Sequence, residues 1–212
     1  MGQKAFYYDN SRCTGCKTCE MACKDFKDLS ADIPFRRVFD YEGGQTVSNG
    51  DGTCATSAFM YHLSMACNHC AKPGCLDSCS QGAITKDGDT GLVLVDSEKC
   101  IGCGACVDGC PYGVPQIDPE TSKMVKCDGC YDRVTAGLKP ICVESCPLRA
   151  LDFGELTDMS NQYTDNGPIA PMPESQTIPS ILIKASPAAK APGDTTGMIA
   201  NPKEVATMGT GM

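Results

Sequence analysis

The sequence has no tryptophan, only two histidines and few aromatic residues of any kind. Two histidines leave little material for acid–base catalysis, and no Ser–His–Asp set, carboxylate pair or phosphate-binding loop stands out. The formal net charge of −8 argues against nucleic acid as a partner. The longest apolar runs, at residues 92–95 and 181–183, are far too short to cross a bilayer. We therefore expect no direct insertion into a membrane, and any membrane association would come through another subunit.

Cysteine is the residue that the sequence has in excess. There are 17 cysteines among 212 residues, an odd number, and no signal peptide is recognisable at the start, so a disulfide framework is not expected. A core of apolar side chains alone would be thin, because the hydrophobic content of 42% includes these cysteines. Bound inorganic cofactors are expected to supply much of the folding free energy.

The segment Cys100–Pro111 has the spacing that points to such a cofactor. It follows the pattern C-x2-C-x2-C-x3-C-P, by which bacterial ferredoxins hold cubane iron–sulfur clusters. Three thiolates in one loop can bind three irons of one cluster, and in two-cluster ferredoxins the fourth cysteine ligates the other cluster. The motif therefore predicts a partner motif elsewhere in the chain.

Internal repeats predict how the cysteine groups pair. Residues 8–19 align with residues 95–106, since each has a strand, an aspartate, three further residues and a cysteine loop. Cys79 and Cys146 are both followed by the start of a strand. The second and third groups, at 67–110, then form one uninterrupted ferredoxin-like unit with a hairpin between them. The first and fourth groups stand at the two ends of the cysteine region and form a second unit around it, closed by a strand pair.

Exchange of the fourth cysteine within each pair gives four expected [4Fe–4S] sites. The two outer sites are Cys13, Cys16, Cys19 with Cys146 (the first outer site) and Cys127, Cys130, Cys142 with Cys23 (the second outer site). The two inner sites are Cys67, Cys70, Cys75 with Cys110 (the first inner site) and Cys100, Cys103, Cys106 with Cys79 (the second inner site). Four such sites would take the net charge to about −16. Cys54 is left over and is interpreted as a free thiol.

The predicted fold class is α+β, with two nested ferredoxin-like units built from short hairpins and short helices around the clusters. The expected divisions are 1–30 for the first half of the outer unit, 31–63 for an inserted hairpin, 64–119 for the inner unit, 120–157 for the second half of the outer unit, and 158–212 for an extended arm. Disorder is the competing interpretation of the arm. We favour contact with partner subunits, because the arm has apolar side chains to bury, namely Ile178, Ile181, Leu182 and Ile183.

Structural zinc is the main alternative to iron, because C-x2-C pairs also form zinc knuckles. An all-cysteine zinc site usually takes two such pairs, whereas two groups here have three cysteines within seven residues. His69 lies in a cysteine loop whose four ligands are already present, so it is expected to pack or to donate a hydrogen bond to a cluster sulfur. Five lysines lie beside or within the cysteine groups, namely Lys17, Lys24, Lys72, Lys99 and Lys126. The sequence does not decide whether they raise the reduction potentials of the clusters or are solvated surface charges.

Longer strings around the cysteines resemble one family. They are residues 11–20, 22–29, 126–134 and 139–154, together with 193–197 and 200–205 in the arm. They resemble the four-cluster electron-transfer subunits of molybdopterin oxidoreductases, and within these the dimethyl sulfoxide reductase branch. Ser80 follows Cys79 where proline would be usual, which removes no ligand. Cys103 fills a position at which nitrate reductase relatives have tryptophan and a three-iron cluster, so the resemblance implies four [4Fe–4S] clusters.

The resemblance also implies a heterotrimer. An integral membrane subunit would oxidise menaquinol, this non-catalytic subunit would relay the electrons, and a molybdopterin catalytic subunit would reduce dimethyl sulfoxide or related S- or N-oxides in anaerobic respiration. The complex would lie at the periplasmic face of the bacterial inner membrane through its anchor subunit. The same relay could instead serve thiosulfate, tetrathionate, polysulfide, selenate or formate chemistry. The alternative from a different functional class is a structural adaptor, held together by zinc, that only joins the catalytic and membrane subunits.

Replacement of Cys146 tests the nested arrangement. Because Cys146 is expected to complete the first outer site, Cys146→Ala should damage that site, and EPR of the reduced protein should show which cluster is lost. Loss of the second outer site instead would mean that the nesting is wrong.

Overall fold

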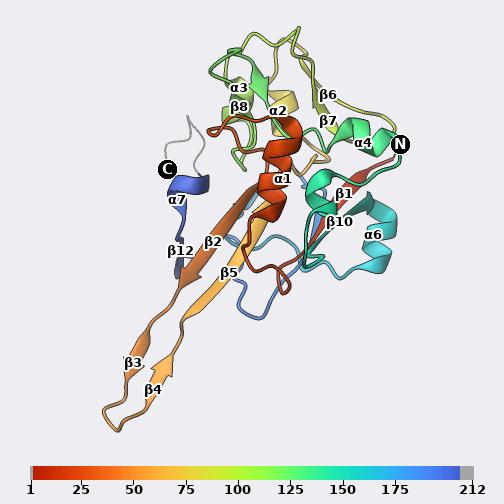
Figure 1. The fold of residues 1–212 in the computed structure, drawn as a ribbon. Coiled ribbons are helices and arrows are strands. Elements are labelled where there is room, and N and C mark those ends of the chain that lie inside the picture. Colours follow the sequence, from red (N-terminus) through yellow and green to blue (C-terminus); the bar gives the residue numbers. More distant parts are fainter. Residues whose placement is uncertain (1, 206–212) are drawn as a thin grey trace.

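The computed structural model describes residues 2–205 and shows an α+β body from which one hairpin projects (Figure 1). Most helices are about one turn long, and the sheets have two or three strands. These short elements confirm the predicted α+β class. Within the described residues, no helix has the length and apolar character that crossing a membrane requires.

The two ends of the cysteine region meet in one sheet, as the nested arrangement requires. β1 (Lys4–Asp9) pairs antiparallel with β10 (Leu151–Glu155). Phe6 lies opposite Phe153, with their ring centroids 4.8 Å apart, and this aromatic contact stabilises the pairing. The repeat predicted a strand pair here, and the register confirms it.

The inner unit contains the predicted hairpin between its two cysteine groups. β6 (Ile84–Lys86) pairs antiparallel with β7 (Val93–Val95). The Asp87 carboxylate closes the turn, since it accepts hydrogen bonds from the backbone N–H of Thr90 at 2.8 Å and from the Thr90 hydroxyl at 2.6 Å.

The predicted insertion is a long hairpin. β2 (Arg37–Gly43) pairs along its whole length with β5 (Phe59–Met65), so the second strand runs past the expected boundary at residue 63. Further out, β3 (Thr46–Ser48) and β4 (Cys54–Thr56) form an exposed ribbon that projects from the body (Figure 1). Cys54 therefore lies on this ribbon, away from the helices that carry the cysteine groups.

Four helices each hold a cysteine whose partner lies four residues further along, within the helix or just after it. They are α1 (Thr18–Lys27), α2 (Gly74–Asp77), α3 (Ala105–Asp108) and α5 (Ile141–Glu144). α1 packs against α5, and α2 packs against α3. Each helix pair therefore brings four cysteines together. The other short elements are α4 (Tyr131–Thr135), α6 (Leu156–Gln162), α7 (Pro202–Val205), β8 (Gln116–Ile117) and β9 (Met124–Val125).

The C-terminal arm folds back onto the body. β11 (Ile181–Lys184) lies parallel to β1, and β12 (Gly197–Ile199) lies antiparallel to β2. Three of the four apolar side chains that were expected to be buried by a partner are already buried by this chain, namely Ile181, Leu182 and Ile183. Contact of the arm with partner subunits stays a prediction, the expected boundary at 157 falls within α6, and residues 206–212 of the arm lie outside the described residues.

The arm offers a matched test of this packing. Ile183 is fully buried opposite Tyr8, so Ile183→Ala should destabilise the chain by about 2–5 kcal/mol. Ile178 is 52% exposed, so Ile178→Ala should change stability by no more than about 0.5 kcal/mol. Anaerobic urea unfolding followed by circular dichroism measures both, and equal midpoints for the two variants would contradict the docked arm.

Candidate iron–sulfur sites

The first inner site is a cavity between β5, α2 and α3. Its four expected cysteines all line this cavity. Cys67 and Cys70 come from the loop after β5, Cys75 from α2, and Cys110 from the turn after α3. The rest of the wall is mainly apolar and includes Pro73, Val93, Tyr112, Val114 and Pro115.

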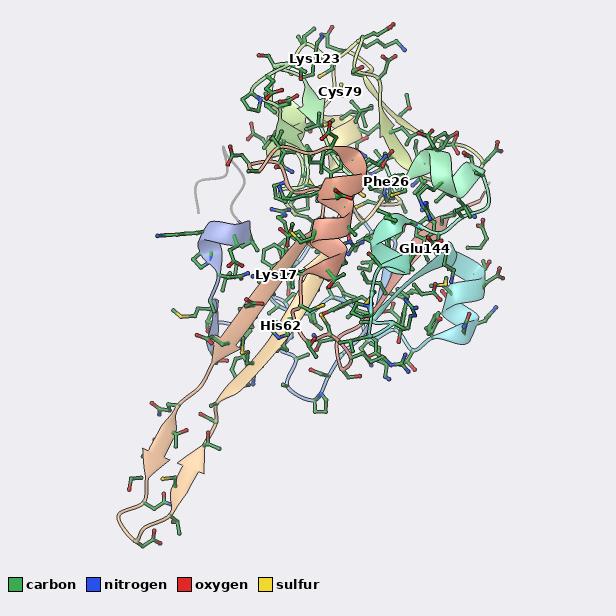
Figure 2. The ribbon with its side chains drawn as sticks, viewed as in Figure 1. Lys17, Phe26, His62, Cys79, Lys123 and Glu144 are labelled. Atoms are coloured by element: carbon green, nitrogen blue, oxygen red, sulfur yellow. The ribbon has the colours of Figure 1, made fainter. Side chains whose placement is uncertain are left out.

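The second inner site is also a cavity. Its four expected cysteines line it together with Ala83, Ile84, Ile101 and Met124. The backbone N–H of Met124 lies 3.3 Å from Cys100 Sγ, and Lys123 Nζ donates a hydrogen bond to the Cys100 carbonyl. Cys79 and Lys123 lie at the same end of the molecule (Figure 2). Cys79 thus lies with the third cysteine group and Cys110 with the second, which favours the predicted exchange, and ligation by these sets stays a prediction.

The outer cysteines gather in two sets. Burial raises the pKa of the Cys13 thiol, and the charges of Cys146 and Cys16 add to the rise, so these three groups lie close together. Burial also raises the pKa of Cys23 to about 12, and the charges of Cys142 and Cys130 add to that rise. The fourth cysteine group therefore lies against the first, and the ligand sets of the two outer sites stay a prediction.

The thiols fit a cluster better than a single metal ion. Burial raises the pKa of Cys70 to about 11 and that of Cys75 to about 12, so free thiolates are unfavourable there and a strongly binding cation is needed to displace the protons. A zinc site needs ligands that converge, because each sulfur lies about 2.3 Å from the ion. Among residues 2–205, no three histidine, cysteine or carboxylate side chains converge in this way. The cysteines of the two inner sites instead surround cavities, as a cubane requires.

The four sites lie in one row. The two outer sites adjoin. Burial raises the pKa of Cys19 in the first outer site, and the charge of Cys142 in the second adds to the rise, which shows that the two thiols lie near each other. The second outer site adjoins the first inner site, because after burial the charge of Cys67 is the main factor that raises the pKa of Cys127. The two inner sites share the packed helices α2 and α3. The order is therefore first outer, second outer, first inner and second inner.

Exposure differs along this row. Cys16 in the first outer site and Cys103 in the second inner site are exposed. All four cysteines of the second outer site are buried, and three of the four in the first inner site are buried. The row is thus open to solvent at its two ends and closed in the middle.

His69 and Lys126 lie where the second outer and first inner sites meet. His69 is buried, and its Nδ1 accepts a hydrogen bond from the Val93 N–H at 3.0 Å, while its Nε2 has no partner among the described residues. Lys126 is also buried, and its Nζ donates to the carbonyls of Val93 and Cys127. Both residues were singled out from the sequence, and the hydrogen bond expected from His69 to a cluster sulfur stays a prediction.

The other lysines have more ordinary surroundings. Lys17 pairs with Glu204 and lies 3.9 Å from Asp40, whose carboxylate also shares a 2.8 Å hydrogen bond with His62 Nδ1 (Figure 2). Lys99 pairs with Asp96 at 3.0 Å. Lys24 donates to two backbone carbonyls, and Lys72 is exposed.

Arg36 and Ser64 also lie beside the outer sites, and neither was predicted from the sequence. Arg36 lies well outside every cysteine group in the sequence, yet its guanidinium is buried beside the outer sites. Ser64 lies on β5, with its hydroxyl 3.3 Å from Cys19 Sγ. Neither position has a local sequence signal, because only the folding of the inserted hairpin onto α1 brings them there.

The chain is similar to known iron–sulfur proteins. Residues 58–156 match a family described as a 4Fe-4S dicluster domain, and residues 10–28 match one described as a 4Fe-4S binding domain. The chain is 48% identical to the B subunit of anaerobic dimethyl sulfoxide reductase from Haemophilus influenzae, over 97% of this chain and 100% of the relative. It is 51% identical to the Escherichia coli protein of the same name, over 96% and 98%. A formate dehydrogenase iron–sulfur subunit of Haemophilus influenzae is 36% identical over 71% of this chain and 51% of the relative.

Gly129 tests the close packing at the second outer site. Its φ is +71°, and an added Cβ would lie 2.8 Å from Leu92 and 3.2 Å from His69 Nε2. Gly129→Ala should therefore displace the loop between Cys127 and Cys130 and lower iron content at this site, in addition to a backbone cost of about 1–2 kcal/mol.

Gly137→Ala is the matched control. Its φ is +80°, so the backbone cost is similar, but no atom lies within 4 Å of the added Cβ. Iron analysis and EPR of both purified variants would compare them, and equal iron content would contradict the close packing of His69 on this loop.

Proposed function

Because the chain belongs to the family of anaerobic dimethyl sulfoxide reductase B subunits, we propose that it relays electrons from a quinol-oxidising membrane subunit to a molybdopterin catalytic subunit. Proteins of this family are non-catalytic iron–sulfur subunits, and the chain carries four [4Fe–4S] clusters. The catalytic partner would reduce dimethyl sulfoxide or related S- or N-oxides. The heterotrimer would be held at the periplasmic face of the inner membrane by its anchor subunit.

The row of four sites is the observation that carries this proposal. A bound [4Fe–4S] cluster supplies one-electron redox chemistry. The sixteen cysteines of the outer and inner sites would be the ligands of four such clusters. Each cluster would take three cysteines from one group and one from the paired group. Helices shared by neighbouring sites fix the separations between them, and the apolar walls exclude water from the middle of the row.

The exposed ends suit an exchange of electrons with two different partners. Cys16 would face one redox partner and Cys103 the other, because these two are exposed among the sixteen expected ligands. Ile101 is exposed beside Cys103, and Met21 is exposed on α1 near the opposite end. Apolar side chains at both ends are suited to burial in subunit interfaces.

The second candidate function is the same relay for a different molybdoenzyme. Similarity to a formate dehydrogenase iron–sulfur subunit favours a relay of the same kind beside another molybdoenzyme. The dimethyl sulfoxide reductase relatives are more similar to this chain, and the match covers almost the whole of both proteins. We therefore prefer the dimethyl sulfoxide reductase relay.

EPR of the anaerobically purified, dithionite-reduced protein tests the relay. We expect signals that integrate to four reduced clusters per chain, with roughly sixteen iron atoms, because each site would hold four. Midpoint potentials from a redox titration should allow stepwise transfer along the row. Colourless, EPR-silent protein that contains zinc would overturn the proposed function.

A further inference from the structure

Arg36 is a cation that the fold buries almost completely. The side chain is 2% exposed, and its guanidinium carbon lies 4.9 Å from the centroid of the Phe6 ring. Within the described residues, its hydrogen bonds go to Ser64 alone and none goes to a carboxylate. A buried charge without a counter-charge is strongly unfavourable, so the fold must supply negative charge by other means.

Ser64 connects this cation to the first outer site. Arg36 Nη1 donates to the Ser64 hydroxyl at 3.1 Å and to the Ser64 carbonyl at 3.2 Å. The same hydroxyl lies 3.3 Å from Cys19 Sγ. Arg36 is thus separated from a cluster cysteine by one serine oxygen.

Two further donors of Arg36 have no acceptor in the protein. Nε and Nη2 are buried, and neither has a hydrogen-bond partner among the described residues. Unpartnered buried N–H groups are rare in folded proteins, and a charged donor is especially costly to leave unpaired. A bound cluster would supply sulfur acceptors, since its thiolates and sulfides accept hydrogen bonds.

The cysteines around Arg36 come from both outer sites. Burial alone would lower the pKa of Arg36, but the charges of nearby thiols raise it overall. These thiols are Cys142, Cys19, Cys127 and Cys23, so one belongs to the first outer site and three to the second. The guanidinium therefore stays charged, and it stands between two sites that each carry about −2 when a cluster is bound.

We propose that Arg36 is the shared counter-ion of the two outer sites and raises the reduction potentials of the clusters held there. Each reduction adds one negative charge, and a fixed cation in a buried site stabilises the reduced form more than the oxidised form. This inference rests on the proposed function, because it requires clusters on the outer cysteines. One side chain would thus raise the reduction potentials of two of the four clusters.

The neighbouring residue is a built-in control. Arg37 is also buried, but its Nη2 donates to the carbonyls of Tyr112 at 2.9 Å and Gly113 at 3.0 Å, and its Nη1 donates to Val205 at 3.3 Å. Tyr112 follows Cys110, so Arg37 lies toward the first inner site. Removal of this guanidinium also deletes a buried charge from the same stretch of chain, but away from the outer sites.

Potentiometric EPR titration of the full-length, cluster-loaded protein tests the proposal. Arg36→Gln should disfavour reduction of both outer clusters about tenfold, a shift of about 59 mV to lower potential for a one-electron couple. Arg36→Lys keeps the charge and should shift these potentials by less than half as much. Arg37→Gln should leave the outer potentials in place. Variants Cys16→Ser and Cys103→Ser assign signals to the outer and inner ends.

The outcomes separate this inference from the proposed function. Absence of iron–sulfur signals in the unaltered protein would remove the proposed function itself. Four normal clusters in Arg36→Gln with unchanged potentials would overturn the inference alone, as would an equal shift of the outer potentials in Arg37→Gln. Where Arg36→Gln fails to retain the outer clusters, Arg36→Lys decides. Retention of both outer clusters with the charge in place supports the inference, and their loss despite the charge overturns it.

Discussion

Helical spacing within the cysteine groups is the constraint on which the rest of the structure depends. Two cysteines four residues apart lie on one face of a helix, yet the proposed ligand sets assign them to neighbouring sites. α1 and α5 pack together and contribute cysteines to both outer sites, and α2 and α3 do the same for the inner sites. Each helix pair therefore fixes two sites and the separation between them, so a change in the packing of one helix must affect two sites at once.

Buried polar groups stand at the junctions of the row, and they are balanced in different ways. Lys126 is held by backbone carbonyls, and His69 is neutral because burial lowers its pKa well below the usual value. Arg36 differs from both, because two of its donors lack an acceptor within the described residues. The interior of the row is thus buried without being uniformly apolar, and positive charge is placed where negative charge would gather.

The sequence predicts those parts of the fold that repeat or alternate. The pairing of β1 with β10 was predictable, because the repeat leaves a strand at each end of the cysteine region without a partner. The parallel pairing of β11 with β1 was not predictable, since four residues of a proline-rich arm give no signal of where they dock. Arg36 could not be found either, because the burial of a charge is decided by which segments fold over it. The order of the sites likewise needed the packing between units.

The central position of β1 in its sheet has a consequence for folding during synthesis. β1 ends at Asp9, but its neighbours β10 and β11 begin only at Leu151 and Ile181, so β1 is synthesised long before either of them. The inner unit is complete at Cys110 and can close on its own segment while synthesis continues, since domains fold as units while the chain emerges. The first thirty residues must wait, because pairing across such a sequence separation is slow and needs the whole loop between the strands. Closure of the outer sheet therefore waits for the synthesis of Ile181–Lys184, well after the inner unit can close.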